Sequence, residues 1–210
     1  VVGAMAIGAE ESRYREVPSW ANWEAQGGGE VTGLGFDGKG AAWLFVRQET
    51  FAEGADQTHT RPGSTFSPLT KVDVKTGKVL KSLGDKQFAL PHGLYYDKRG
   101  FLWTTDLGSS LRKDLGYTVT KWDLEGRPLL TLGKKGVKGG DRDTFDSPTA
   151  VRVAPNGDIF VSDGHGTGPV QRIVKFSPDG KYIKEWGTNG TGAGQFRGPH
   201  GLEFDSRGRL

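Results

Sequence analysis

The sequence predicts an all-β fold made of repeated four-stranded units, and three observations lead to this prediction. A frame of the form Phe-x-x-Pro-(His/Thr)-(small)-(aliphatic) occurs three times, at 88–94, 145–151 and 196–202. Each copy runs into a short alternating segment and then a turn, as strands joined by tight connections do. The composition, with 34 Gly, 10 Pro and only 34% hydrophobic residues among 210, is typical of many short strands rather than of helices.

Turns recur at matching places and divide each repeat into four expected strands. These strands are 34–36, 41–46, 70–74 and 78–82 in unit one, 94–96, 102–105, 118–122 and 129–132 in unit two, and 151–153, 159–162, 173–176 and 183–186 in unit three. A fourth unit opens with an expected strand at 202–204 and then breaks off. A lone strand is expected at 14–20, where its proline suits a sheet edge.

The spacing of the repeats identifies the architecture. If Gly33, Gly93, Ala150 and Gly201 are equivalent, the repeats are 60, 57 and 51 residues long. Four strands in a repeat of this length indicate a propeller blade, which buries its faces by stacking on neighbours around an axis. We therefore predict a β-propeller, incomplete at its C-terminus, with about three and a half blades in residues 14–210. Four tryptophans on the strands are expected to pack between blades: Trp43, Trp103, Trp122 and Trp186.

Composition narrows the classes of function. The absence of Cys excludes disulfides and cysteine-based metal sites or nucleophiles. The formal net charge is +3 with both signs scattered, so nothing favours nucleic acid as a partner. Residues 1–13 look like the tail of an apolar targeting segment, so we predict a signal-peptide remnant or disordered leader and a secreted or periplasmic location. No stretch approaches the roughly 20 apolar residues of a membrane span.

Two of the four histidines, His92 and His200, occupy the same frame position in units two and four. The residue before each first strand is expected at the mouth of the central channel, and two blades are one third of a turn in a six-bladed ring. Three such histidines would converge on the axis as a Zn²⁺ site with an open position. Thr149 is the non-ligand between them, and the third ligand is expected beyond Leu210. The alternative is that Pro-His-Gly is simply a well-formed loop.

Three segments carry a resemblance to a known family. They are FALPHGL at 88–94, VSDGHGTGPVQRIVKFSPDGKYIKEWG at 161–187 and GQFRGPHGLEFD at 194–205. Together they resemble the NHL-repeat propellers, and among these the peptidyl-α-hydroxyglycine α-amidating lyases. The resemblance extends over nearly all of residues 14–210. It implies a six-bladed propeller with a Zn²⁺ in its channel and a structural Ca²⁺.

The resemblance also implies roles for individual residues. His92 and His200 match two of the three zinc-binding histidines of the family. Leu34 and Leu94 match positions whose backbone carbonyls hold the calcium ion, and carbonyl oxygens are ligands that Ca²⁺ favours. Arg47 matches an arginine that would pair with a substrate carboxylate; the alternative for Arg47 is a charge on the rim.

His165 departs from the family, which has a tyrosine in its place as the proposed proton acceptor. The histidine could act as a general base, since its ordinary pKa lies near neutrality. It could instead add a metal ligand, or the reaction could differ. His59 lies in a polar insertion and is expected to be exposed. Asp106 and Asp163, which close second strands, are expected to be loop braces that accept backbone N–H bonds.

The resemblance implies a lyase that splits a peptide ending in α-hydroxyglycine into a peptide amide and glyoxylate. In that reaction Zn²⁺ would lower the pKa of the substrate hydroxyl, His165 would take its proton, and Arg47 would hold the carboxylate. The alternative is a non-catalytic NHL propeller that binds a protein or a glycan. A second enzymatic alternative is a metal-dependent lactonase or esterase on a similar propeller, but the Asp, Asn and Glu ligands that are usual there are absent from the frame positions.

Overall fold

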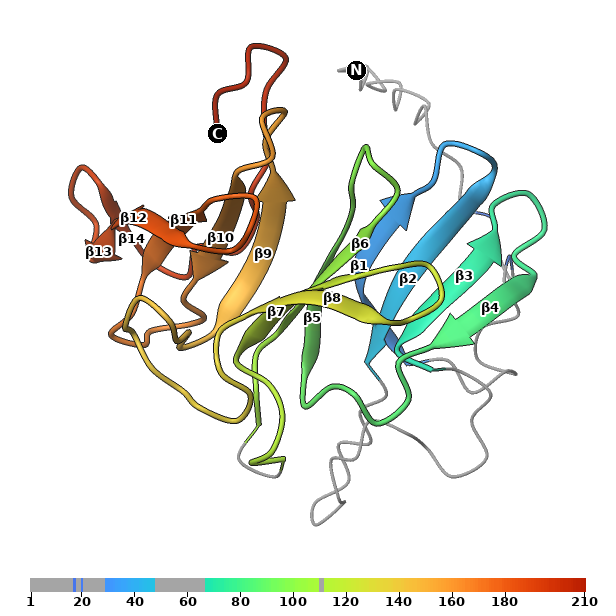
Figure 1. Ribbon diagram of the computed structural model, residues 1–210, viewed down its shortest axis with the longest axis horizontal. Coiled ribbons are helices and arrows are strands. Elements are labelled where there is room, and N and C mark those ends of the chain that lie inside the picture. The colour runs from blue at the N-terminus through green and yellow to red at the C-terminus, as the bar shows by residue number, and fades with distance from the viewer. Residues whose placement is uncertain (1–16, 18–19, 21–28, 48–66, 110–111) are drawn as a thin grey trace, which may run out of the picture.

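A computed structural model describes residues 17, 20, 29–47, 67–109 and 112–210, and these residues form strands, turns and loops (Figure 1). The leader expected at 1–13, most of the strand expected at 14–20, and His59 lie outside the described residues. No helix in the described part of the chain is long and apolar enough to cross a membrane.

The described strands form three four-stranded antiparallel sheets, each a meander in chain order. The first sheet contains β1 (Glu30–Phe36), β2 (Ala41–Arg47), β3 (Leu69–Asp73) and β4 (Val79–Leu83). The second contains β5 (Pro91–Tyr96), β6 (Leu102–Asp106), β7 (Thr118–Trp122) and β8 (Pro128–Leu132). The third contains β9 (Pro148–Val153), β10 (Ile159–Asp163), β11 (Arg172–Phe176) and β12 (Tyr182–Trp186). The predicted blades of a partial β-propeller are confirmed.

Two details at the C-terminal end differ from the prediction. The glycine-rich stretch after β12 forms a small parallel pair, β13 (Thr188–Asn189) with β14 (Gln195–Phe196), which the sequence did not predict. The strand expected at 202–204 is wrong, because that segment is irregular. Among the described residues no strand pairs with it, and an isolated strand has no partner for its backbone N–H and C=O groups.

The blades pack face to face, and the packing explains the small residue of the repeated frame. A Cβ atom on Gly33 of β1 would lie 2.5 Å from the Leu94 backbone nitrogen on β5. A Cβ atom on Gly93 of β5 would overlap the carbonyl oxygen of Thr149 on β9. Glycine is therefore required where the first strands of successive blades approach each other.

Two hydrophobic clusters fill the spaces between blades. One brings Trp43 and Phe45 of the first sheet against Leu94 and Leu102 of the second. The other brings Trp103 of the second sheet against the third. The inter-blade packing predicted for Trp43, Trp103 and Trp122 is confirmed, since all three are buried in these clusters. Trp186 instead is half-buried on the outer strand β12 and contacts the Phe160 ring within its own sheet.

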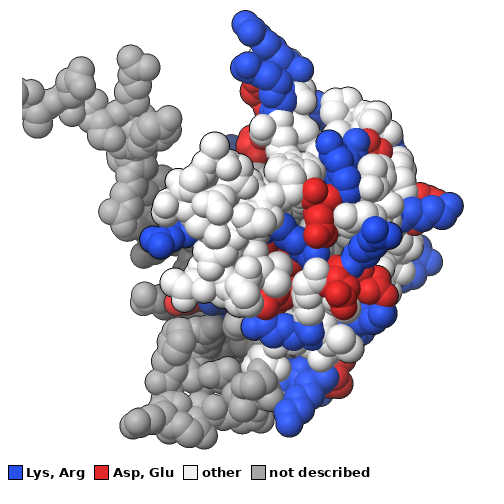
Figure 2. Space-filling view, turned by 90° about the vertical axis from the view of Figure 1, so that its left-hand side faces the viewer, with Lys and Arg blue, Asp and Glu red and all other residues white. Residues whose placement is uncertain are grey.

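Charged side chains of both signs are interspersed on the face shown in Figure 2, next to a largely uncharged area. This face corresponds to the left-hand side of Figure 1, where the third sheet lies. Interspersed charges do not create the extended positive field that nucleic acids select. The face therefore gives no support to nucleic-acid binding.

Candidate metal centre

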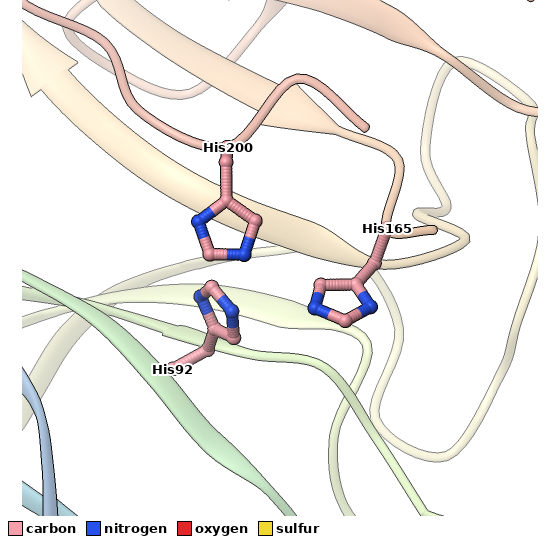
Figure 3. A group of neighbouring side chains, drawn as sticks. All are labelled: His92, His165 and His200. Atoms are coloured by element: carbon pink, nitrogen blue, oxygen red, sulfur yellow. The ribbon is translucent and has the colours of Figure 1, made fainter. Parts of the chain in front are cut away.

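Three histidines from different parts of the chain point toward one another (Figure 3). The ring centroids lie 4.6 Å apart for His92 and His200, 5.4 Å for His92 and His165, and 5.3 Å for His165 and His200. One ring nitrogen from each of the three lies within 4.8 Å of those of the other two. The structure thus brings His92 and His200 together, as the spacing of the repeats predicted, and adds His165 to them.

Each histidine is positioned by the blade that carries it. His92 is the second residue of β5 and is buried, with 7% of its surface exposed. His165 lies on the turn after β10, and His200 follows Pro199 in the segment after β14. Both of these rings belong to exposed residues. The cluster is therefore anchored on one buried imidazole and open to solvent on the side of the other two.

Two aspartates hold the loops that lead into the site. Asp106 accepts hydrogen bonds from the backbone N–H groups of Ala89 and Leu90, at 2.8 and 2.7 Å, in the stretch just before His92. Asp163 accepts hydrogen bonds from the backbone N–H groups of Asp146 and Ser147. The prediction that Asp106 and Asp163 are loop braces is confirmed.

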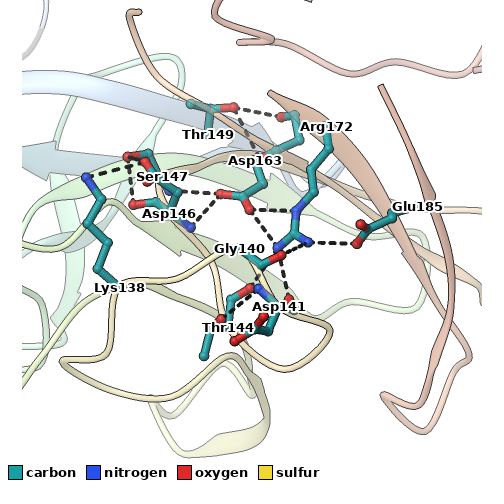
Figure 4. Close-up of polar contacts among 11 residues, drawn as sticks. Lys138, Gly140, Asp141, Thr144, Asp146, Ser147, Thr149, Asp163, Arg172 and Glu185 are labelled. Carbon is teal, nitrogen blue, oxygen red and sulfur yellow. Dashed lines mark hydrogen bonds and ion pairs between the residues drawn. The ribbon is translucent and has the colours of Figure 1, made fainter. Parts of the chain in front are cut away.

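Asp163 is further held by Arg172, at the centre of the network in Figure 4. The Nε atom of Arg172 donates to Asp163 at 3.0 Å, and its terminal nitrogens donate to Glu185 and to three backbone carbonyls. Burial raises the pKa of Asp163 to about 6, while Arg172 and the backbone N–H groups favour the charged carboxylate. Because Asp163 lies two residues before His165, this network fixes the start of the loop that carries the third imidazole.

Thr149 connects the two predicted ligands. Its carbonyl oxygen lies 3.0 Å from Nδ1 of His92, and because a carbonyl only accepts, Nδ1 carries the proton. Its hydroxyl donates to the carbonyl oxygen of Pro199, directly before His200, at 2.6 Å. Sequence reasoning treated Thr149 only as the position without a ligand and missed these contacts.

The electrostatics keep two of the imidazoles neutral. Burial, opposed by the hydrogen bond to Thr149 and assisted by the charges of His200, His165 and Arg47, lowers the pKa of His92 to about 4. Burial, His200 and Arg47 also lower the pKa of His165. Metal ions bind the neutral form of histidine, so the lowered pKa values of His92 and His165 favour the form that a metal requires.

Arg47, at the end of β2, lies beside the cluster. Its Nε and Nη2 atoms donate to the carbonyl oxygen of Pro91, at 3.1 and 3.0 Å, immediately before His92. Its Nη1 atom lies 3.7 Å from the Glu30 carboxylate. The guanidinium therefore supports the first imidazole and places a positive charge next to the cluster.

The donor set fits a zinc ion. Imidazole nitrogen is a preferred zinc ligand, and three histidines with an open fourth position are a known catalytic arrangement. The hydrogen bond from Nδ1 of His92 to a backbone carbonyl leaves Nε2 with its lone pair, and such outer partners usually orient zinc-binding histidines. Leu34 and Leu94, the residues expected to hold calcium, lie on β1 and β5, whose strands pack closely at Gly33.

Comparisons with known proteins identify relatives of the chain. The chain is 37% identical over 191 residues to peptidyl-glycine α-amidating monooxygenase B of Xenopus laevis, a match covering 85% of the chain and 21% of the relative. It is 34% identical over 168 residues to peptidyl-α-hydroxyglycine α-amidating lyase 1 of Drosophila melanogaster, covering 77% of the chain and 30% of the relative. The chain thus spans less than a third of the length of either relative.

The other comparisons address the fold alone. A solved structure of a protein of unknown function from Bacteroides thetaiotaomicron superposes with a TM-score of 0.53 at 15% identity, covering 82% of this chain and 41% of that one. No family model matches the sequence.

The fold and the cluster define a partial β-propeller with a candidate metal centre between its blades. Its homologues include a peptidyl-α-hydroxyglycine α-amidating lyase and a peptidyl-glycine α-amidating monooxygenase, in agreement with the resemblance carried by the two PHGL segments.

Proposed function

We propose that the protein is a metal-dependent lyase that cleaves the C–N bond of a peptide ending in α-hydroxyglycine. In this reaction the hydroxyl loses its proton, its carbon and oxygen form the C=O group of glyoxylate, the C–N bond breaks, and the nitrogen gains a proton to become the peptide amide. The convergence of His92, His165 and His200 carries the proposal. The names of the lyase relatives supply the substrate class.

The chain's own residues provide binding and orientation. His92 and His200 would hold a zinc ion, which acts as a Lewis acid toward an oxygen of the substrate when bound. Arg47 would attract the substrate carboxylate, because its charge lies beside the cluster and lowers the pKa of both neighbouring imidazoles. The neutral ring of His165 suits either proton acceptance or metal ligation.

Calcium and location are further parts of the proposal. The backbone carbonyls of Leu34 and Leu94 would contribute to a structural Ca²⁺ site between the first two blades. A secreted or periplasmic location would suit a peptide-processing enzyme with the predicted leader at 1–13. The family resemblance supports the calcium site, and the apolar character of residues 1–13 supports the location.

The test is product formation by the full chain. A peptide with a C-terminal α-hydroxyglycine is incubated with zinc-loaded protein, and glyoxylate and the peptide amide are measured together. We expect stoichiometric amounts of both from the wild type, loss of both with His92→Ala, and retention with the control His59→Ala. A protein that binds zinc tightly and forms no glyoxylate would contradict the proposal.

A further inference from the structure

The geometry points to His165 as a third metal ligand, so that the chain forms a three-imidazole site from His92, His165 and His200. This inference deepens the proposed function and rests on its metal. The three ring centroids form a nearly equilateral triangle with sides of 4.6, 5.3 and 5.4 Å. His165 thus lies at almost the same distance from each of the other two rings.

The size of this triangle matches that of three imidazoles around one metal ion. With Zn–N bonds of about 2.0–2.1 Å and tetrahedral angles, the centroids of three ligating imidazoles lie on the order of 5 Å apart. A base instead reaches the substrate oxygen through a hydrogen bond of about 2.6–3.2 Å, so its ring lies further from the metal than a ligand ring does. The observed distances of 5.3 and 5.4 Å from His165 correspond to the ligand.

The surroundings of the rings agree with this assignment. Nδ1 of His92 is held by the Thr149 carbonyl, so its metal-binding nitrogen is Nε2. The loop of His165 starts at Asp163, which is fixed by Arg172, whereas His165 itself is exposed and can turn its ring toward an ion. Ring nitrogens within 4.8 Å of one another need only small side-chain rotations to close on a cation. As a ligand, His165 would leave acceptance of the hydroxyl proton to solvent or another base.

The experiment measures metal binding rather than activity. Zinc affinity of the full chain is determined by competition with a chromophoric chelator, and the visible spectrum of the Co²⁺-substituted protein is recorded. The variants are His165→Ala and His165→Gln, with Thr167→Ala as a control because this residue is exposed on the same loop and carries no imidazole. Circular dichroism confirms that each variant is folded.

We expect both His165 variants to lose at least about 100-fold in zinc affinity, since even an outer-shell partner typically accounts for 10–100-fold. Their Co²⁺ spectra should change, and x-ray absorption should show one imidazole fewer around zinc. Thr167→Ala should match the wild type. If His165→Ala binds zinc within about threefold of the wild type with an unchanged Co²⁺ spectrum, His165 is not a ligand, although His92→Ala would still abolish binding. If the wild type binds no zinc at all, both the inference and the metal of the proposed function are overturned.

Discussion

Thr149→Val tests whether the contacts of Thr149 hold the candidate site in place. Valine has nearly the shape of threonine, so the substitution removes the hydroxyl without opening a cavity. That hydroxyl donates to the Pro199 carbonyl at 2.6 Å and lies 2.7 Å from the Ser162 hydroxyl, which then donates to it. Both partners would lose a hydrogen bond, and Ser162 is fully buried.

The magnitude follows from these two contacts. A hydrogen bond contributes about 0.5–1.5 kcal/mol net, so the loss of two costs about 1–3 kcal/mol; the Ser162 hydroxyl keeps the hydrogen bond that it accepts from the Ala150 N–H. We therefore expect Thr149→Val to lower the free energy of unfolding by roughly 2 kcal/mol in metal-free protein. If the site holds zinc, the affinity should also fall about tenfold, because the segment that carries His200 is no longer fixed.

Urea unfolding of the metal-free protein and zinc competition measure the two effects separately. Thr149→Ser is the matched control, since serine keeps the hydroxyl and loses only a methyl group, and it should retain most of the zinc affinity. A Thr149→Val protein that is as stable as the wild type, or that binds zinc equally well, would refute the assigned positioning role.

Two further predictions concern the scaffold. Arg172→Met should lower the free energy of unfolding by about 3–5 kcal/mol, because it leaves the fully buried Asp163 carboxylate without its ion-pair partner. The control Arg127→Met, at an exposed ion pair, should lower it by less than about 1 kcal/mol. Similar urea midpoints for the two variants would show that the network in Figure 4 does not stabilise the fold. Gly93→Ala should lower the free energy of unfolding by about 1–3 kcal/mol, since the new Cβ atom would overlap the Thr149 carbonyl. The control Gly201→Ala should leave the melting temperature unchanged, because no atom lies within 4 Å of its Cβ position. Equal melting temperatures for the two variants would contradict the packing described.

Much of the fold could be predicted from the sequence because the repeat itself encodes the packing. Gly33 and Gly93, the small residues of the frame, lie where the first strands of neighbouring blades approach each other closely. The spacing of these small residues therefore predicted the positions of the blades. The meeting of His92 and His200 followed from their equal positions in alternate units. The symmetry of the repeats follows from the frame alone, and the frame is a short pattern that can be found in the local sequence.

Other features depend on contacts between distant segments. Thr149 reaches Pro199 across 50 residues, and nothing in the frame shows which carbonyl a hydroxyl will select. His165 lies outside the strands, so the periodicity of the sequence could not predict where its ring points. Only the family resemblance indicated that this residue has a role. The strand expected at 202–204 failed for the opposite reason, since a local pattern cannot supply the pairing partner that a strand needs.

The three imidazoles belong to β5, the turn after β10 and the segment after β14, which lie in separate parts of the sheet arrangement. A cation bound by all three would therefore cross-link blades that otherwise contact one another through packed side chains. Release of the ion would remove this cross-link and leave the hydrophobic clusters to hold the blades together, so a bound cation would add to the stability of the whole arrangement.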